Sequence, residues 1–155
     1  MKKQAFNPYL PPYEFIPDGE PRVYDNRLYV YGSHDSFNGE IYCLGDYVCY
    51  SAQVDDLGNW TFEGVIFRKR QDPYYEESLP MGLIAPDSIQ GPDGRYYLFY
   101  VIGVFSRIGV AVCDSPAGHY EFLGYVHFED GTELNSNCGN GLMFDPAVYV
   151  ENRDV

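Results

Sequence analysis

Apolar and polar residues alternate over short stretches of this chain, and turn-forming residues separate the stretches. Residues 28–31, 48–51 and 96–100 are rich in Tyr, Val, Leu and Phe, while Gly, Pro, Asn and Asp stand between such runs. Runs of this kind are typical of short β-strands. No stretch keeps an apolar repeat of 3.6 residues, so we expect almost no helix. The pattern predicts an all-β fold.

The strand pattern repeats after about sixty residues. Residues 48–64 end in an aromatic strand that contains Trp60, Phe62 and Gly64, and residues 110–124 end in a strand with matching residues at the same spacing. The matching residues of the second copy are Tyr120, Phe122 and Gly124. Repetition at a fixed period indicates that one structural unit occurs more than once.

The segment before each aromatic strand also repeats, as a predicted hairpin. The first hairpin turns at Asp25-Asn26, and the second turns at Pro92-Asp93-Gly94. Asp-Gly between alternating apolar runs is a strong hairpin signal. A third copy begins at Asp145.

Each full repeat therefore holds four strands, which is the content of one blade of a β-propeller. We expect blade I at about 18–67, blade II at about 84–129 and the start of blade III at about 142–155. We expect Trp60 and Tyr120 where outer strands pack between blades. A propeller closes with at least about four blades. The chain is thus predicted to form a truncated portion, about two and a half blades of four-stranded antiparallel sheet.

Every repeat opens with an acidic residue, namely Glu20, Asp87 or Asp145. The first strand of a propeller blade lines the central axis, so acids at equivalent positions converge there. Carboxylates brought together raise one another's pKa and cost stability, and folds keep such clusters mainly where chemistry uses them. The alternative is that each acid is a turn residue that begins a strand.

The ordered set of motifs resembles glycoside hydrolase family 43, whose fold is a five-bladed β-propeller. The resemblance covers nearly the whole chain. Any one motif is weak, but the set in this order is specific. The motifs are Asn7-Pro8-Tyr9-Leu10, Glu20-Pro21-Arg22-Val23, Asp55-Asp56-Leu57-Gly58-Asn59-Trp60, Ala85-Pro86-Asp87 and Phe144-Asp145-Pro146-Ala147.

The resemblance implies an inverting glycosidase, in which a general base and a general acid lie roughly 6.5–9.5 Å apart to admit water. By position, Glu20 is the expected general base, and Asp18 is the alternative because the family's base is usually Asp. Asp145 is the expected modulator of the acid's pKa, and Asp87 is a supporting residue near the axis. The family's general acid is a Glu of the fourth blade, beyond residue 155.

Four further residues are candidates for contacts with the substrate. His34 and Asp35 follow the second strand of blade I and are expected at the rim of the axial pocket, unless they are only a turn His and a capping Asp. Ile84 stands where the family often has an aromatic residue that stacks on the sugar. Arg107 occupies the matching loop of blade II, where it contacts substrate or neutralises the acid cluster.

Composition and charge limit the kinds of partner that the chain is expected to bind. The net charge of −13 argues against nucleic acid, which is bound by clustered Lys and Arg. The four cysteines, at 43, 49, 113 and 138, show neither a disulfide framework nor metal-ligand spacing. We therefore expect no metal bound by these residues and no cofactor, although the complete family fold accommodates a metal ion at its axis.

The chain shows neither an apolar signal segment nor a membrane-spanning stretch. A cytoplasmic location without a membrane partner is the default expectation.

The expected partner is an oligosaccharide, cleaved by β-xylosidase or α-L-arabinofuranosidase chemistry on hemicellulose-derived sugars. Because the general acid is missing, we expect the chain alone to be inactive. The alternative is a non-catalytic carbohydrate-binding propeller fragment. Either protein would expose unpaired blade edges, which favour a homo-oligomer.

Overall fold

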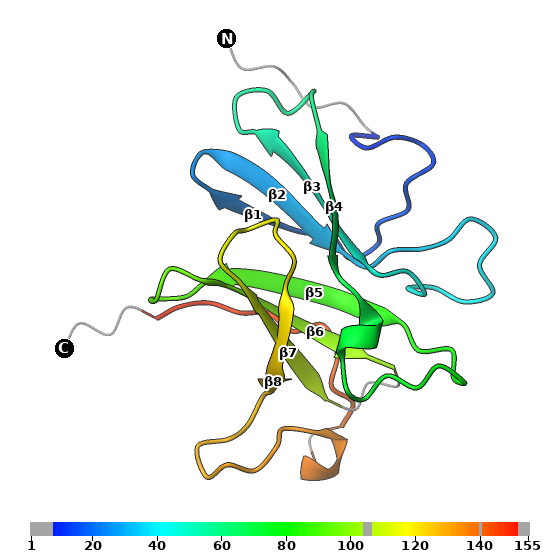
Figure 1. Ribbon diagram of the computed structural model, residues 1–155, viewed down its shortest axis with the longest axis vertical. Helices are drawn as coiled ribbons and strands as arrows, with labels where there is room; N and C mark the ends of the chain where they lie inside the picture. Colours follow the sequence, from blue (N-terminus) through cyan, green and yellow to red (C-terminus); the bar gives the residue numbers. More distant parts are fainter. Residues whose placement is uncertain (1–7, 104–106, 140, 152–155) are drawn as a thin grey trace.

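The computed structural model describes residues 8–103, 107–139 and 141–151 and contains two four-stranded antiparallel sheets (Figure 1). In each sheet the strands lie in sequence order. The first sheet consists of β1 (Glu20–Tyr24), β2 (Arg27–Gly32), β3 (Tyr47–Gln53) and β4 (Thr61–Phe67). The second consists of β5 (Leu83–Gln90), β6 (Tyr96–Ile102), β7 (Ile108–Cys113) and β8 (Glu121–Tyr125). The predicted all-β fold built from four-stranded units is confirmed.

Helix is confined to two short 3₁₀ turns in the described part of the chain, η1 (Lys69–Gln71) and η2 (Ser136–Cys138). Neither turn comes near the length that a membrane crossing requires, so no described helix qualifies as a membrane span. All four cysteines are free thiols, as the sequence pattern indicated.

The pairing register shows that the two sheets are copies of one unit. One row of paired residues runs across the first sheet, and the corresponding row runs across the second. The two rows are Glu20–Tyr31–Cys49–Gly64 and Asp87–Phe99–Val110–Gly124. A register shift follows the third residue of each row, between Cys49 and Tyr50 and between Val110 and Ala111. The repeat read from the sequence is therefore present in the hydrogen bonding.

The first hairpin turns where the sequence predicts it. Asp25 and Asn26 have φ values of 47° and 61°, and Tyr24 pairs with Arg27 across them. Two consecutive positive φ values define a type I′ turn, whose twist matches that of the flanking strands. Asp and Asn tolerate this conformation better than most residues.

Buried tyrosines connect the two sheets. Tyr31 and Tyr120 are fully buried, and both hydroxyls donate to the carbonyl of Pro116, over 2.6 and 3.1 Å. The backbone amide of Tyr120 donates to Ile66 in β4, so Tyr120 lies at the junction of the sheets as expected. Trp60 instead packs against Tyr9, with ring centroids 5.1 Å apart.

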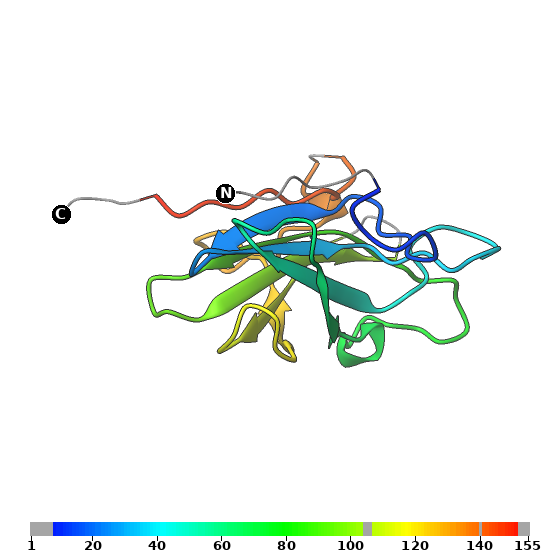
Figure 2. The ribbon, with the colours of Figure 1, turned by 90° about the horizontal axis from the view of Figure 1, so that it is seen from above.

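The first strands of the two sheets lie close together, because β5 packs against β1 and β2. Residues 141–151 run past this region without forming a strand. Figure 2 shows this segment, in red, on the side of the molecule that carries the blue first hairpin, opposite the yellow strands that end blade II. The start of blade III at 142–155 remains a prediction, and residues 152–155 lie outside the described part.

Candidate active site

Three residues in left-handed conformation lie in successive repeats, one two residues before β1, one within β5 and one in the segment after blade II. Asp18, Ala85 and Asp145 have φ values of 53°, 37° and 50°, although none of them is glycine. Such strained residues are uncommon and gather at functional sites. The backbone near the candidate acids is therefore held in an unusual conformation.

This local geometry changes which acids correspond to one another. Counting two residues onward from each left-handed position gives Glu20, Asp87 and Ala147. Glu20 and Asp87 occupy the same row of their sheets, as the sequence indicated. Asp145, however, matches Asp18 in backbone conformation, and not Glu20. The sequence instead predicted that Glu20 and Asp145 are equivalent, because each is an acidic residue followed by Pro.

The residues on either side of Asp18, Pro17 and Gly19, lie against Gly32 at the end of β2. Burial raises the pKa of the Cys43 thiol, and the carboxylates of Asp35 and Asp18 raise it further. Burial also raises the pKa of Tyr47, again with a contribution from Asp18. The Tyr47 hydroxyl donates to the Ile84 carbonyl over 2.9 Å. The segment that carries the exposed Asp18 thus adjoins β2 just before Ser33, whose hydroxyl accepts the Ala85 amide of β5 over 2.8 Å.

Glu20 is also exposed, and it is the first residue of β1, two positions after Asp18. The pKa of Arg22 is raised mainly by its hydrogen bond to Asp87. The Glu20 carboxylate also raises it, more weakly. The two candidate bases therefore raise the pKa of different neighbours. Asp18 raises that of Cys43 and Tyr47, and Glu20 raises that of Arg22.

Asp87 is almost completely buried, with 1% of its surface exposed, and its carboxylate is saturated with donors. Arg22 donates to it from Nε over 2.9 Å and from Nη2 over 2.5 Å. The Ser88 and Val148 amides donate over 2.7 and 2.8 Å. Asp87 therefore binds β1 and the segment that carries Asp145 at the same time.

His34 and Asp35 lie at the end of β2 and hold the loop that follows. The Asp35 carboxylate accepts the Cys43 amide over 2.5 Å, and the Asp35 amide donates to Phe15. His34 Nε2 lies 3.4 Å from the carboxylate of Glu14. Both side chains are half-buried and are engaged by protein groups.

Arg107 lies away from the Arg22–Asp87 pair. Its guanidinium stacks between the rings of Tyr74 and Tyr125, 4.3 and 4.8 Å from their centroids. It also lies 3.5 Å from the Glu133 carboxylate. The basic residue bound to Asp87 is Arg22, which stands in the Glu20-Pro21-Arg22-Val23 motif but is not among the predicted site residues. Its spacing, two residues after Glu20 on the same inner strand, was the available signal.

Ile84 is 8% exposed and lines a cavity of about 570 Å³ near the start of β5. Tyr42, Tyr74 and Met81 also line this cavity. Its walls are mostly apolar and aromatic.

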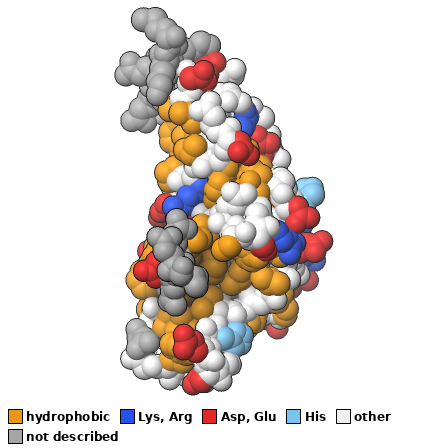
Figure 3. Space-filling view, turned by 90° about the vertical axis from the view of Figure 1, so that its left-hand side faces the viewer, with side chains coloured by type: hydrophobic (Ala, Val, Ile, Leu, Met, Phe, Trp, Pro, Cys, Tyr) orange, Lys and Arg blue, Asp and Glu red, His pale blue; other side chains and the backbone are white. Residues whose placement is uncertain are grey.

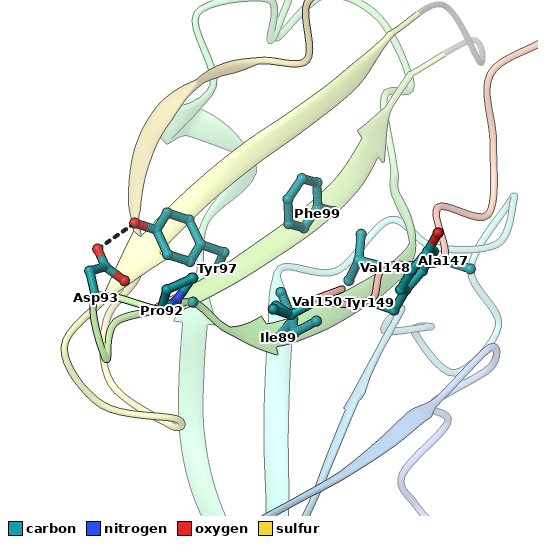
Figure 4. A pocket seen from close by; sticks show the side chains of 10 residues that line it. Ile89, Pro92, Asp93, Tyr97, Phe99, Ala147, Val148, Tyr149 and Val150 are labelled. Carbon is teal, nitrogen blue, oxygen red and sulfur yellow. Dashed lines mark hydrogen bonds between the residues drawn. The ribbon is translucent and has the colours of Figure 1, made fainter. Parts of the chain in front are cut away.

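A second hollow, of about 550 Å³, lies between β5, β6 and residues 147–150 (Figure 4). Ile89, Phe99 and Ala147 line it, and at its edge the Tyr97 hydroxyl donates to Asp93 over 2.7 Å. None of the candidate acids Asp18, Glu20, Asp87 and Asp145 lines this hollow. It is a mostly apolar junction between blade II and the following segment.

Comparisons with known proteins agree with this architecture. No family model matches the chain. A protein of Thermoclostridium stercorarium named xylosidase/arabinosidase is 58% identical over 151 residues, which are 97% of this chain and 32% of that protein. The chain thus spans about a third of this relative's length.

Two solved structures share the fold. An α-L-arabinofuranosidase of Clostridium thermocellum, named CtGH43, is 32% identical with a TM-score of 0.63, covering 86% of this chain and 44% of that one. A GH43 β-xylosidase/α-arabinofuranosidase from a compost metagenome, solved with xylotriose in a calcium-free form, is 28% identical with a TM-score of 0.54, covering 77% and 40%. By its sequence and by its two propeller blades, this chain matches part of the enzymes of glycoside hydrolase family 43.

Proposed function

We propose that this chain supplies part of the active site of an inverting glycoside hydrolase that removes xylose or arabinofuranose units from hemicellulose-derived oligosaccharides. The observation that carries the proposal is the left-handed conformation that Asp18 and Asp145 share, with φ values of 53° and 50°. The names of the relatives support the sugar class.

In this proposal Asp18 is the general base. Its carboxylate takes a proton from the water that attacks the anomeric carbon, while a general acid on the opposite side protonates the leaving oxygen. That acid belongs to a blade that this chain does not include. Asp145 is the modulator, since its negative charge close to the acid raises the acid's pKa and keeps it protonated.

Asp18 is preferred to Glu20 for two reasons. Asp18 shares its backbone conformation with Asp145, whereas Glu20 lies in a regular strand and corresponds to Asp87. Glu is also one methylene longer than Asp, which displaces its oxygens by about a bond length. The alternative that the sequence left open thus becomes the proposed base.

The proposed chemistry is acid–base catalysis by carboxylates and does not itself require a cofactor. Among the residues that the structure describes, no three His, Cys, Asp or Glu side chains are grouped to hold a metal ion.

The test uses a chimera in which this chain replaces the matching 151 residues of the 58%-identical relative. We expect the chimera to hydrolyse nitrophenyl xyloside or arabinofuranoside. Asp18→Asn should lower kcat by roughly 10²–10⁴-fold, the usual contribution of a general base. Glu20→Gln is the matched control and should change kcat only a few-fold.

Two outcomes would contradict the proposal. An inactive but folded chimera that binds xylotriose would favour the alternative, a carbohydrate-binding propeller without catalysis. Loss of activity in Glu20→Gln with normal activity in Asp18→Asn would return the base to Glu20.

A further inference from the structure

The Asp87 carboxylate joins three separate parts of the chain. Arg22 reaches it from β1, Ser88 lies beside it on β5, and the Val148 amide reaches it from the segment that begins at Asp145. Arg22 Nη2 also lies 3.4 Å from the Val148 carbonyl. Arg22 and Asp87, called here the inner clamp, therefore hold the backbone three residues after Asp145.

The corresponding positions at the next junction are apolar. Arg22 pairs with Tyr29, and Ile89 pairs with Tyr97 at the same place in the second sheet. Ala147 corresponds to Asp87, because each lies two residues after a left-handed residue. Ile89 and Ala147 both line the apolar hollow of Figure 4. Ile and Ala thus replace Arg and Asp at these two positions of the second junction.

Stability alone gives little reason for the inner clamp. Burying the Asp87 carboxylate and most of the Arg22 side chain, which is 33% exposed, costs about as much as their attraction returns, so an apolar pair of similar volume is often neutral or better. What a bidentate Arg–carboxylate pair adds is fixed geometry. Every oxygen of Asp87 already accepts hydrogen bonds, which leaves it no free position for proton transfer to a substrate.

We propose that Arg22 and Asp87 are positioning residues that hold the Asp145 segment at a fixed distance from Asp18. The clamp connects β1, which begins two residues after Asp18, to the backbone at Val148. Its effect on catalysis rests on the proposed function, because it acts through Asp145. Its effect on the backbone does not depend on that function.

The first experiment measures the backbone effect in this chain. The double variant Arg22→Ile with Asp87→Ala copies the residues of the second junction. Hydrogen exchange at the Val148 amide should become at least about tenfold faster, while exchange in β6 stays unchanged. Arg27→Ile with Glu63→Ala is the control, because that pair, 3.5 Å apart, joins β2 to β4. Unchanged exchange at Val148 would overturn the proposal.

The second experiment measures kcat against pH in the chimera with the same two double variants. Displacing Asp145 should lower the pKa of the general acid, so the alkaline limb of the profile should move to lower pH. A misplacement of about 1 Å should also lower kcat on the order of 100-fold. The Arg27/Glu63 control should keep both the limb and kcat.

The outcomes separate the two proposals. If kcat falls only in proportion to the fraction of folded protein, and the alkaline limb of the pH profile does not move, the inner clamp is purely structural. That result would overturn its positioning role. An inactive parent chimera would refute the proposed function instead, and the Val148 exchange result would still decide whether the clamp holds the segment.

Discussion

Single residues in left-handed conformation serve two purposes in this chain. At Asp25 and Asn26 they form a type I′ turn, which short polar residues adopt readily. At Asp18 and Asp145 they carry the candidate carboxylates. The first use is local, so the sequence reveals it. The second becomes apparent only when backbone angles are compared between repeats.

The positive φ of Asn26 in this turn makes the effect of substitutions there predictable. Asn26→Val should destabilise the chain by about 1–2 kcal/mol, because a β-branched residue strains a φ of 61°. Asn26→Gly is the control and should be neutral or slightly stabilising, since glycine adopts positive φ freely. Urea unfolding followed by tyrosine fluorescence measures both. Equal stability of the two variants would contradict the type I′ turn.

At the scale of strands, packing limits which residues a strand accepts. Gly109 in β7 pairs with Tyr100 in β6, and a Cβ added at Gly109 would lie 2.5 Å from the Tyr100 ring. Gly124 in β8 has nothing within 4 Å of the corresponding position. The two glycines therefore have different reasons to be there.

We expect Gly109→Ala to destabilise the chain by about 1–3 kcal/mol through overpacking. Gly124→Ala should change the free energy of unfolding by less than about 1 kcal/mol. Chemical denaturation of both variants, with near-ultraviolet circular dichroism to follow the tyrosines, measures the difference. A Gly109→Ala variant as stable as the native chain would show that Tyr100 moves aside without cost.

The strands and their repeat could be read from the sequence because they depend on alternation and on turns, which are local. The Arg22–Asp87 pair could not, because its partners are 65 residues apart and meet only when two sheets pack. Trp60 and Tyr120 match in sequence, yet only Tyr120 lies at the junction of the two sheets. Equivalent positions in two blades acquire different neighbours, and that information is absent from the repeat.

For the molecule as a whole, the buried tyrosines predict that the folded chain loses stability at high pH. Burial raises the pKa of Tyr31, Tyr47, Tyr100 and Tyr120 above the ordinary value of 10.0. The unfolded chain releases these protons first as the pH rises, so it binds fewer protons than the native chain. The stability that these buried tyrosines contribute is therefore fully present below about pH 10 and is lost as the pH rises above it. Thermal unfolding between pH 8 and 11.5 should show this decline, and a constant Tm would contradict it.

The surface of the chain predicts self-association. Hydrophobic side chains gather on the face seen in Figure 3, and several large apolar residues of the segment after blade II are exposed. These residues are Leu142, Phe144, Tyr149 and Val150. We expect sedimentation analysis of the chain alone to show dimers or larger species at micromolar concentration. A monomer of 17.7 kDa at all concentrations would contradict assembly through these surfaces.

In the proposed function, this chain carries Asp18 and Asp145 of a glycosidase site whose general acid lies elsewhere. The most direct measurement compares hydrolysis of nitrophenyl xyloside and arabinofuranoside by the chain alone and by the chimera with its relative. We predict no detectable turnover by the chain and measurable turnover by the chimera, lost in Asp18→Asn. Turnover by the chain alone, or a folded chimera without activity, would contradict the account.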